Sequence, residues 1–71
     1  MEIKVKILGA GSIGNHLAYA CRQLDWSATV CDIDAEALRR TRDEIFPSRY
    51  GKWDEAIRLM RPTEVADETF E

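Results

Sequence analysis

The chain places apolar and polar residues in an order that predicts two short strands. Ile3, Val5 and Ile7 alternate with lysines over residues 3–8, a pattern that indicates a first strand. The uncharged and partly β-branched residues 28–31 predict a second strand. A strand buried on both faces is a continuous apolar run. The lysines therefore place the beginning of the first strand near an edge of the sheet or leave one of its faces partly uncovered.

Helical spacing appears between these strands and again after the second one. The first helix is predicted over residues 12–24, with an apolar stripe that packs on the sheet. That stripe consists of Ile13, Leu17, Ala20, Cys21 and Leu24. A second helix is predicted over residues 35–46, with Asp34 as its N-cap and Pro47 as its end. A short third helix is expected over residues 54–60, and no third strand is evident.

Three glycines directly follow the first predicted strand. The segment Gly9-Ala10-Gly11-Ser12-Ile13-Gly14 joins that strand to the first helix, and Asp32 ends the second strand eighteen residues after the last glycine. A strand, a glycine turn, a helix, a strand and an acidic residue follow one another in this order in a dinucleotide-binding βαβ unit. We therefore predict an α/β fold: a partial Rossmann fold (β-α-β-α plus a short helix) with parallel strands and a right-handed crossover.

The glycine turn is predicted to bind the pyrophosphate of the dinucleotide. Gly9 allows a tight turn out of the strand, Gly11 leaves no Cβ between backbone and phosphate, and Gly14 lets the helix pack closely on the sheet. Ser12 and Ile13 open the helix, where unpaired N–H groups and the positive end of the helix dipole face the phosphates. The alternative is a helix-packing turn in a domain that binds no nucleotide.

Asp32 is predicted to accept hydrogen bonds from the hydroxyls of the adenine-side ribose. Its carboxylate repels a 2′-phosphate, and no lysine or arginine occurs between Arg22 and Arg39. We therefore expect NAD as the cofactor, in preference to NADP. Ile33 is a candidate contact for the adenine face. The alternatives are an exposed acid at a strand end for Asp32, and for Asp34 an N-cap without a role in binding.

The length of 71 residues allows one small domain at most. Residues 1–62 are predicted to form the partial dinucleotide-binding domain. Residues 63–71 contain four acids and no base, which is typical of an acidic tail or a connector to a missing remainder. Two strands make a poor independent sheet, so we expect a homo-oligomer that forms through the sheet edge or an exposed core.

Composition argues against several other kinds of function. The net charge of −3 gives no electrostatic reason to bind nucleic acid, and no apolar run approaches the length of a membrane span, so we expect a soluble, cytoplasmic protein. His16, Cys21 and Cys31 form no metal-binding motif, and we predict no metal site. Ser12 has no partners that would make it a nucleophile, and His16 is too far from the expected nicotinamide position. We predict no catalytic residue in this chain.

Three segments resemble the oxidoreductase family named after glucose-fructose oxidoreductase and inositol dehydrogenase. Gly9-Ala10-Gly11-Ser12-Ile13-Gly14 looks like the family's glycine turn, and Val30-Cys31-Asp32-Ile33-Asp34-Ala35-Glu36-Ala37-Leu38 is similar to its second strand and helix. Tyr50-Gly51-Lys52-Trp53-Asp54-Glu55-Ala56-Ile57 looks like the turn and short helix before its third strand. The resemblance implies the NAD-binding N-terminal portion of a sugar- or cyclitol-type dehydrogenase. Members carry a catalytic lysine in a later Glu-Lys-Pro motif, which is not found here, so the portion alone is expected to be inactive.

Two other interpretations remain open at this point. Residues 9–34 fit a regulatory nucleotide-sensing module of an ion transport system almost as well, because such modules bind NAD or ATP with a similar glycine turn. Residues 50–57 favour the dehydrogenase, since sensing modules usually reach their third strand through a different sequence. A structural fragment without a ligand is the third possibility.

Overall fold

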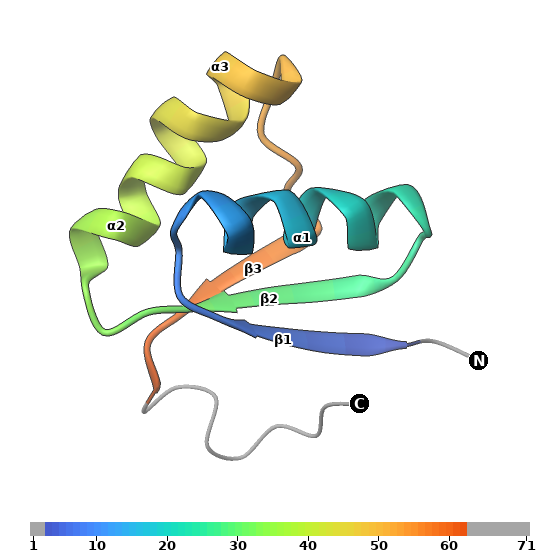
Figure 1. Cartoon of the computed structure of the whole chain (residues 1–71), viewed down its shortest axis with the longest axis horizontal. Helices are drawn as coiled ribbons and strands as arrows, with labels where there is room; N and C mark the ends of the chain where they lie inside the picture. Colours follow the sequence, from blue (N-terminus) through green and yellow to red (C-terminus); the bar gives the residue numbers. More distant parts are fainter. Residues whose placement is uncertain (1–2, 63–71) are drawn as a thin grey trace.

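Three parallel strands form the sheet of the computed structural model, which describes residues 3–62. They are β1 (Lys4–Leu8), β2 (Ser27–Cys31) and β3 (Ile57–Met60), in the spatial order β1-β2-β3 (Figure 1). The predicted α/β fold with parallel strands is confirmed. The acidic tail predicted for residues 63–71 lies outside the described residues.

Four helical segments lie on one face of this sheet (Figure 1). Helix α1 (Ser12–Gln23) connects β1 to β2. The connection from β2 to β3 consists of α2 (Ala35–Arg40), the π-helical turn η1 (Thr41–Ile45) and α3 (Phe46–Tyr50). None of the helices within residues 3–62 has the length and apolar character needed to cross a membrane.

Strand β3 corrects the prediction of a helix over residues 54–60 and of no evident third strand. Ile57 is buried and lies beside Ala28 of β2, while the next residue, Arg58, is exposed. Ile57 and Met60 are three residues apart, which also fits one helical turn. A segment of four residues is too short for its period to distinguish strand from helix. Pairing with β2, which a local pattern does not reveal, makes this segment a strand.

The second helix continues past Pro47, which we had predicted would end it. Helical structure runs without a break over residues 35–50, and Pro47 lies in the first turn of α3. The π-helical turn η1 directly precedes it and changes the backbone hydrogen-bond pattern from i→i+4 to i→i+5. Proline lacks the N–H that an i→i−4 hydrogen bond needs, and Pro47 lies where the π-helical turn interrupts that pattern. Gly51, with a φ of 87°, ends the helix in the left-handed conformation.

Helix α1 turns a different face to the core than its apolar stripe predicted. Its buried residues are Asn15, Ala18 and Cys21. Three members of the predicted stripe are instead exposed: Ile13 by 77%, Leu17 by 49% and Leu24 by 58%. The reason is Gly14, where a Cβ would lie 2.1 Å from the Gly9 carbonyl oxygen. The helix approaches β1 through this glycine, which turns its small residues to the sheet and its large ones outward.

The core fills the space between the sheet and the helices. Phe46 is its largest fully buried side chain, and its ring contacts Trp53 edge-on at 5.0 Å and Tyr50 at 4.9 Å. Tyr50 also stacks on Tyr19 with 4.0 Å between ring centroids. This aromatic cluster joins α3 to α1 and to the loop before β3.

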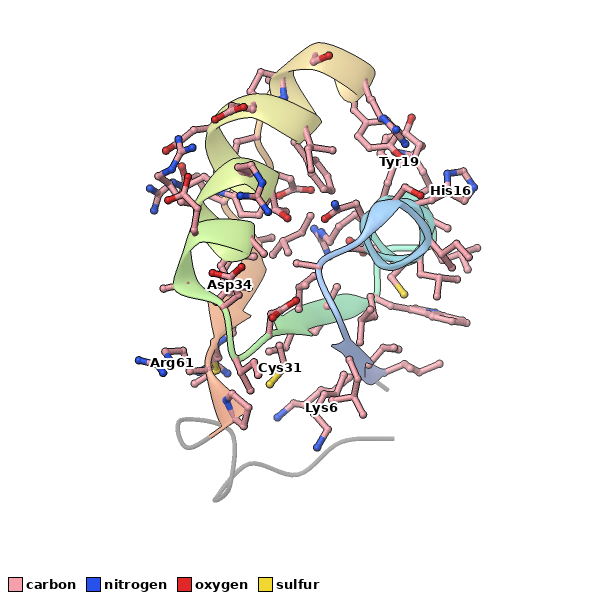
Figure 2. All side chains as sticks on the ribbon, turned by 60° about the vertical axis from the view of Figure 1, so that its left-hand side comes forward. Lys6, His16, Tyr19, Cys31, Asp34 and Arg61 are labelled. Carbon is pink, nitrogen blue, oxygen red and sulfur yellow. The ribbon has the colours of Figure 1, made fainter. Side chains whose placement is uncertain are left out.

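Strand β1 lies at an edge of the sheet, which is one of the two arrangements that its lysines predicted. Val5 and Ile7 pack into the core. Lys6 and Cys31 point to the opposite face, away from the helices (Figure 2). The alternation of apolar and charged residues in β1 therefore reflects a strand with helices on only one side.

Candidate functional site

The glycine turn lies at the carboxyl end of β1, where the chain reverses into α1 (Figure 1). Gly9 has a φ of 102°, a conformation that favours glycine, and its N–H donates to the Cys31 carbonyl at 2.7 Å. Gly14 makes the close approach to Gly9 described above. Gly11 differs from Gly14, because no atom lies within 4 Å of a Cβ placed on Gly11, and the same holds for Gly9. The space in front of Gly11 is therefore open, as expected for a backbone that a ligand approaches.

The first turn of α1 directs backbone N–H groups out of the protein. Gly11 is the N-cap, and no side chain caps the helix. The Asn15 N–H donates to the Gly11 carbonyl at 2.9 Å, which begins the helical hydrogen-bond pattern. The N–H groups before Asn15, including those of the exposed Ser12 and Ile13, have no acceptor one helical turn earlier. Together with the helix dipole, they favour an anionic ligand at this position.

Asp32 is bound directly to the glycine turn. One carboxylate oxygen accepts from the Ala10 N–H at 2.9 Å, and the other accepts from the Asp34 N–H at 2.8 Å. These two hydrogen bonds, Ala10 first, lower the pKa of the Asp32 carboxyl below its usual value, and the charge of Arg40 adds a smaller effect in the same direction. Asp32 is half-buried, and a carboxylate has about four lone-pair sites, more than these two donors use. The structure therefore holds an ionised acceptor beside the turn.

The residues after Asp32 begin the next helix. Asp34 is the N-cap of α2, as predicted, and accepts from the Glu36 N–H at 3.0 Å. It lies at the start of α2 (Figure 2). Ile33 stands between the two aspartates with 76% of its surface exposed. An exposed isoleucine at this position is available to a flat apolar group.

A groove of about 440 Å³ lies where the carboxyl end of β1 meets the start of α1. It gathers five of the seven residues predicted to bind the cofactor. Its lining consists of Ile7, Leu8, Gly9, Gly11, Ser12, Ile13, Gly14 and Leu17. Asp32 and Ile33 follow β2 and lie outside this lining. The predicted site therefore extends from the groove, across the Ala10 peptide, to the end of β2.

A second cavity, of about 500 Å³, lies at the opposite end of the sheet. It is lined by the aromatic cluster of Tyr19, Phe46, Tyr50 and Trp53 together with Arg22 and Asp54, whose side chains form an ion pair at 3.1 Å. None of the predicted site residues contributes to it. Parallel α/β sheets bind ligands at the carboxyl ends of their strands, so we assign the site to the smaller groove in spite of the larger volume here.

Sequence reasoning missed Asn15, which contacts the turn, and Thr41, which contacts Asn15. Both are fully buried. The Asn15 side-chain amide donates to the Ala10 carbonyl at 3.2 Å, and the Thr41 hydroxyl donates to the Asn15 side-chain oxygen at 2.9 Å. Each is a polar residue within an otherwise unremarkable helical segment. They become recognisable only once the buried face of α1 is known.

The described side chains that could bind a metal or take part in catalysis do not form a second site. Within residues 3–62 no three histidine, cysteine or acidic side chains are grouped in a way that could hold a metal ion. Cys21 and Cys31 are buried free thiols, and burial raises the pKa of Cys21. His16 lies 3.4 Å from the Tyr50 hydroxyl, on the exposed side of α1.

Comparisons of the chain with models of protein families, with curated proteins and with solved structures give no match.

Proposed function

We propose that this chain binds the ADP half of NAD, as the N-terminal cofactor-binding portion of a sugar- or cyclitol-type dehydrogenase. The observation that carries the proposal is the 2.9 Å hydrogen bond from the Ala10 N–H to the Asp32 carboxylate. It brings an open, anion-binding helix start next to an ionised acceptor. In a dinucleotide the pyrophosphate and the adenine-side ribose are adjacent groups, and they need these two kinds of partner side by side.

In this proposal the backbone does most of the binding. The pyrophosphate passes over Gly11, where no Cβ would stand in its way, and accepts hydrogen bonds from the N–H groups of Ser12 and Ile13. The ribose hydroxyls donate to the free acceptor positions of the Asp32 carboxylate. A 2′-phosphate would bring negative charge against that carboxylate, which favours NAD over NADP. Ile33 would contact the adenine face.

Bound NAD supplies the hydride chemistry. The residues of this chain would bind and orient its ADP half. The groups that bind a substrate and transfer its proton would come from outside residues 1–71. Buried, free Cys21 and Cys31 are consistent with a cytoplasmic protein, which we include in the proposal.

We also propose that the chain self-associates along the free edge of β1. Leu8 is 75% exposed there, and Ile13 and Leu17 line the same groove. Large apolar side chains grouped beside an edge strand favour association with another polypeptide. A second copy that covers them would also cover part of the groove assigned to the cofactor, so self-association and NAD binding should compete.

A regulatory nucleotide-sensing module is the second candidate function. It is supported by the partners that residues 3–62 offer, which suit phosphate, ribose and adenine, the groups that NAD shares with ADP and ATP. The two candidates differ in the ligand preferred. A dehydrogenase portion should bind NAD at least as tightly as ATP, whereas an ATP sensor should prefer ATP.

The proposal is tested by titrating the purified chain with NAD, NADP, ADP and ATP. Calorimetry measures the affinity for each nucleotide, and NMR shows which amide signals shift. We expect saturable NAD binding at roughly millimolar concentration, with shifts of the amide signals of residues 9–14. Asp32→Asn should weaken NAD binding by roughly tenfold or more, because a charged acceptor is lost. Asp25→Asn is the matched control, since it removes an equal charge from a side chain that is 98% exposed and distant from the turn. Absence of binding at several millimolar NAD would reject the proposal.

A further inference from the structure

The Ala10 peptide is held by the protein from both sides. Its N–H donates to Asp32 at 2.9 Å, and its carbonyl accepts from the Asn15 side chain at 3.2 Å. This peptide lies in the middle of the glycine turn, between Gly9 and Gly11. Its two glycine neighbours give the turn little rigidity of their own. The conformation of the turn therefore depends on the groups that hold Ala10.

The side chain of Asn15 is in turn held by Thr41, which belongs to the connection between β2 and β3. The Thr41 hydroxyl lies 2.9 Å from the Asn15 side-chain oxygen and 3.1 Å from the Ala37 carbonyl, and it has one proton to share between them. With Thr41 as donor, the Asn15 oxygen faces Thr41 and its NH₂ group faces Ala10. The Ala10 carbonyl can only accept and therefore requires the NH₂ group on its side, and the Thr41 hydroxyl supports that orientation by donating to the amide oxygen on the other side.

These contacts close into a ring through both halves of the candidate site. The ring runs from Thr41 through Asn15 and Ala10 to Asp32, and Asp32 bonds the Asp34 N–H at the start of α2. Helix α2 leads back to Thr41, the first residue of the π-helical turn η1. π-helical turns are frequent at functional sites. In this molecule, η1 begins at the residue that closes the ring.

Both side chains are positioned where polar groups are costly. Asn15 and Thr41 have no exposed surface, and every buried side-chain nitrogen or oxygen in residues 3–62 has a hydrogen-bond partner. An apolar pair would fill the same space without needing any partner. The pair is therefore better explained by what it contacts, the Ala10 carbonyl, than by core packing.

We infer that Asn15 and Thr41 are positioning residues, which fix the Ala10 peptide so that the N–H groups at the start of α1 face the pyrophosphate. This inference rests on the proposed function for its ligand. The part that concerns the turn itself is measurable without any ligand. Loss of the Thr41 hydroxyl should loosen the turn and weaken NAD binding while the fold is retained.

Thr41→Val is the test variant, because valine keeps the shape of threonine and removes its donor. Thr41→Ser keeps the hydroxyl and should behave like the wild type. Ile57→Val is the matched stability control, since it removes one buried methylene at the amino end of β3, far from the turn. Thr41→Ala serves in place of valine if the valine variant does not fold.

Two readouts separate positioning from general destabilisation. The first is hydrogen exchange of the Ala10 N–H relative to that of Val30 in the middle of the sheet. Thr41→Val should increase the hydrogen-exchange rate of the Ala10 N–H by roughly tenfold more than that of the Val30 N–H. Ile57→Val should change the two exchange rates by the same factor. The second readout is NAD affinity. We expect it to fall roughly five- to tenfold in Thr41→Val and to stay within about twofold in the serine and Ile57→Val variants.

The outcomes are distinguishable. Equal exchange ratios in Thr41→Val and Ile57→Val would overturn the inference, as would unchanged NAD affinity in Thr41→Val with wild-type binding intact. If the wild type binds no NAD, the proposed function fails and the role toward a cofactor fails with it. The exchange ratio then still decides whether Asn15 and Thr41 hold the turn.

Discussion

The contact between α1 and β1 at Gly14 leads to a sharp prediction for Gly14→Ala. A Cβ at this position would lie 2.1 Å from the Gly9 carbonyl oxygen and 3.3 Å from both the Gly9 carbonyl carbon and the Ile7 Cγ2 atom. Ordinary contact begins near 3.4 Å, so the first distance is more than an ångström too short. The obstacle is backbone, which cannot rotate away as a flexible side chain would. Helix α1 has to move away from the sheet.

Two opposing effects decide the size of the loss. Alanine is favoured over glycine in a helix by about 1 kcal/mol, which stabilises the variant. Overpacking of a core costs about 1–3 kcal/mol, and contact with backbone places this site at the upper end. We therefore expect a net loss of about 2 kcal/mol in the free energy of unfolding. A domain of this size has roughly 4–10 kcal/mol in total, so the loss is a large fraction of it.

Urea unfolding, followed by far-UV circular dichroism and tryptophan fluorescence, measures this loss. With a slope of about 1 kcal/mol per molar urea, the midpoint should fall by about 2 M. Gly11→Ala is the matched control, because no atom lies within 4 Å of its Cβ and its φ is −83°. Gly11 is the N-cap of α1, where alanine is less favoured than glycine, so the control should lose at most about 1 kcal/mol and yet bind NAD more weakly. A Gly14→Ala variant as stable as the wild type would refute the close approach of helix and strand.

Three further predictions concern the core, Asp32 and the sheet edge. Phe46→Ala should cost about 3–5 kcal/mol, because Phe46 is 1% exposed and contacts two aromatic rings. Urea unfolding measures the cost, and a loss below about 1 kcal/mol would contradict the packing. The hydrogen bonds from Ala10 and Asp34 lower the pKa of Asp32, so the stability that this carboxylate contributes is present above its unfolded pKa of about 3.9 and is lost as the pH falls through the lower folded value. The stability advantage of the wild type over Asp32→Asn should therefore be present at neutral pH and disappear in acid, and an advantage that persists below the folded pKa would argue against it. The chain should sediment as a dimer or larger species at micromolar concentration, and Leu17→Lys should shift it toward the monomer. A folded wild-type monomer at that concentration would reject self-association.

The parts of the fold that depend on local chemistry could be predicted from the sequence. Gly9 was expected in a tight turn and has a φ of 102°. Asp34 was expected as an N-cap and accepts the Glu36 N–H. The lysines of β1 indicated either a position near the sheet edge or a partly uncovered face, and the strand lies at the edge. In each case a single residue type determines the backbone conformation or the exposure near it, so neighbours in sequence carry enough information.

The parts that depend on distant partners could not be predicted in this way. Residues 57–60 form a strand because β2 pairs with them, and their own spacing of apolar residues fits a helix equally well. Pro47 is a helix terminator in most contexts, but here it begins α3 behind a π-helical turn. That turn contains Thr41, whose hydroxyl bonds to Asn15 across 26 residues. A short window of sequence around residues 57–60 does not include β2, and one around Thr41 does not include Asn15.

Two errors in the sequence-based prediction of α1 have one common cause. The apolar stripe was expected to face the sheet, and Asn15 was not expected near the turn. Gly14 was expected to pack on the sheet, and at 100° per residue the positions that share its face are Ala18 and Cys21. The stripe of Ile13, Leu17 and Leu24 is centred about 90° away from that face, so both expectations could not hold together. The contact of Gly14 with Gly9 takes precedence because only a glycine permits it. Once the helix is turned this way, the large apolar residues lie toward the free edge of β1, and Asn15 lies on the other side, toward Thr41. The rotation that exposes the stripe is therefore the same rotation that brings the asparagine to the Ala10 carbonyl.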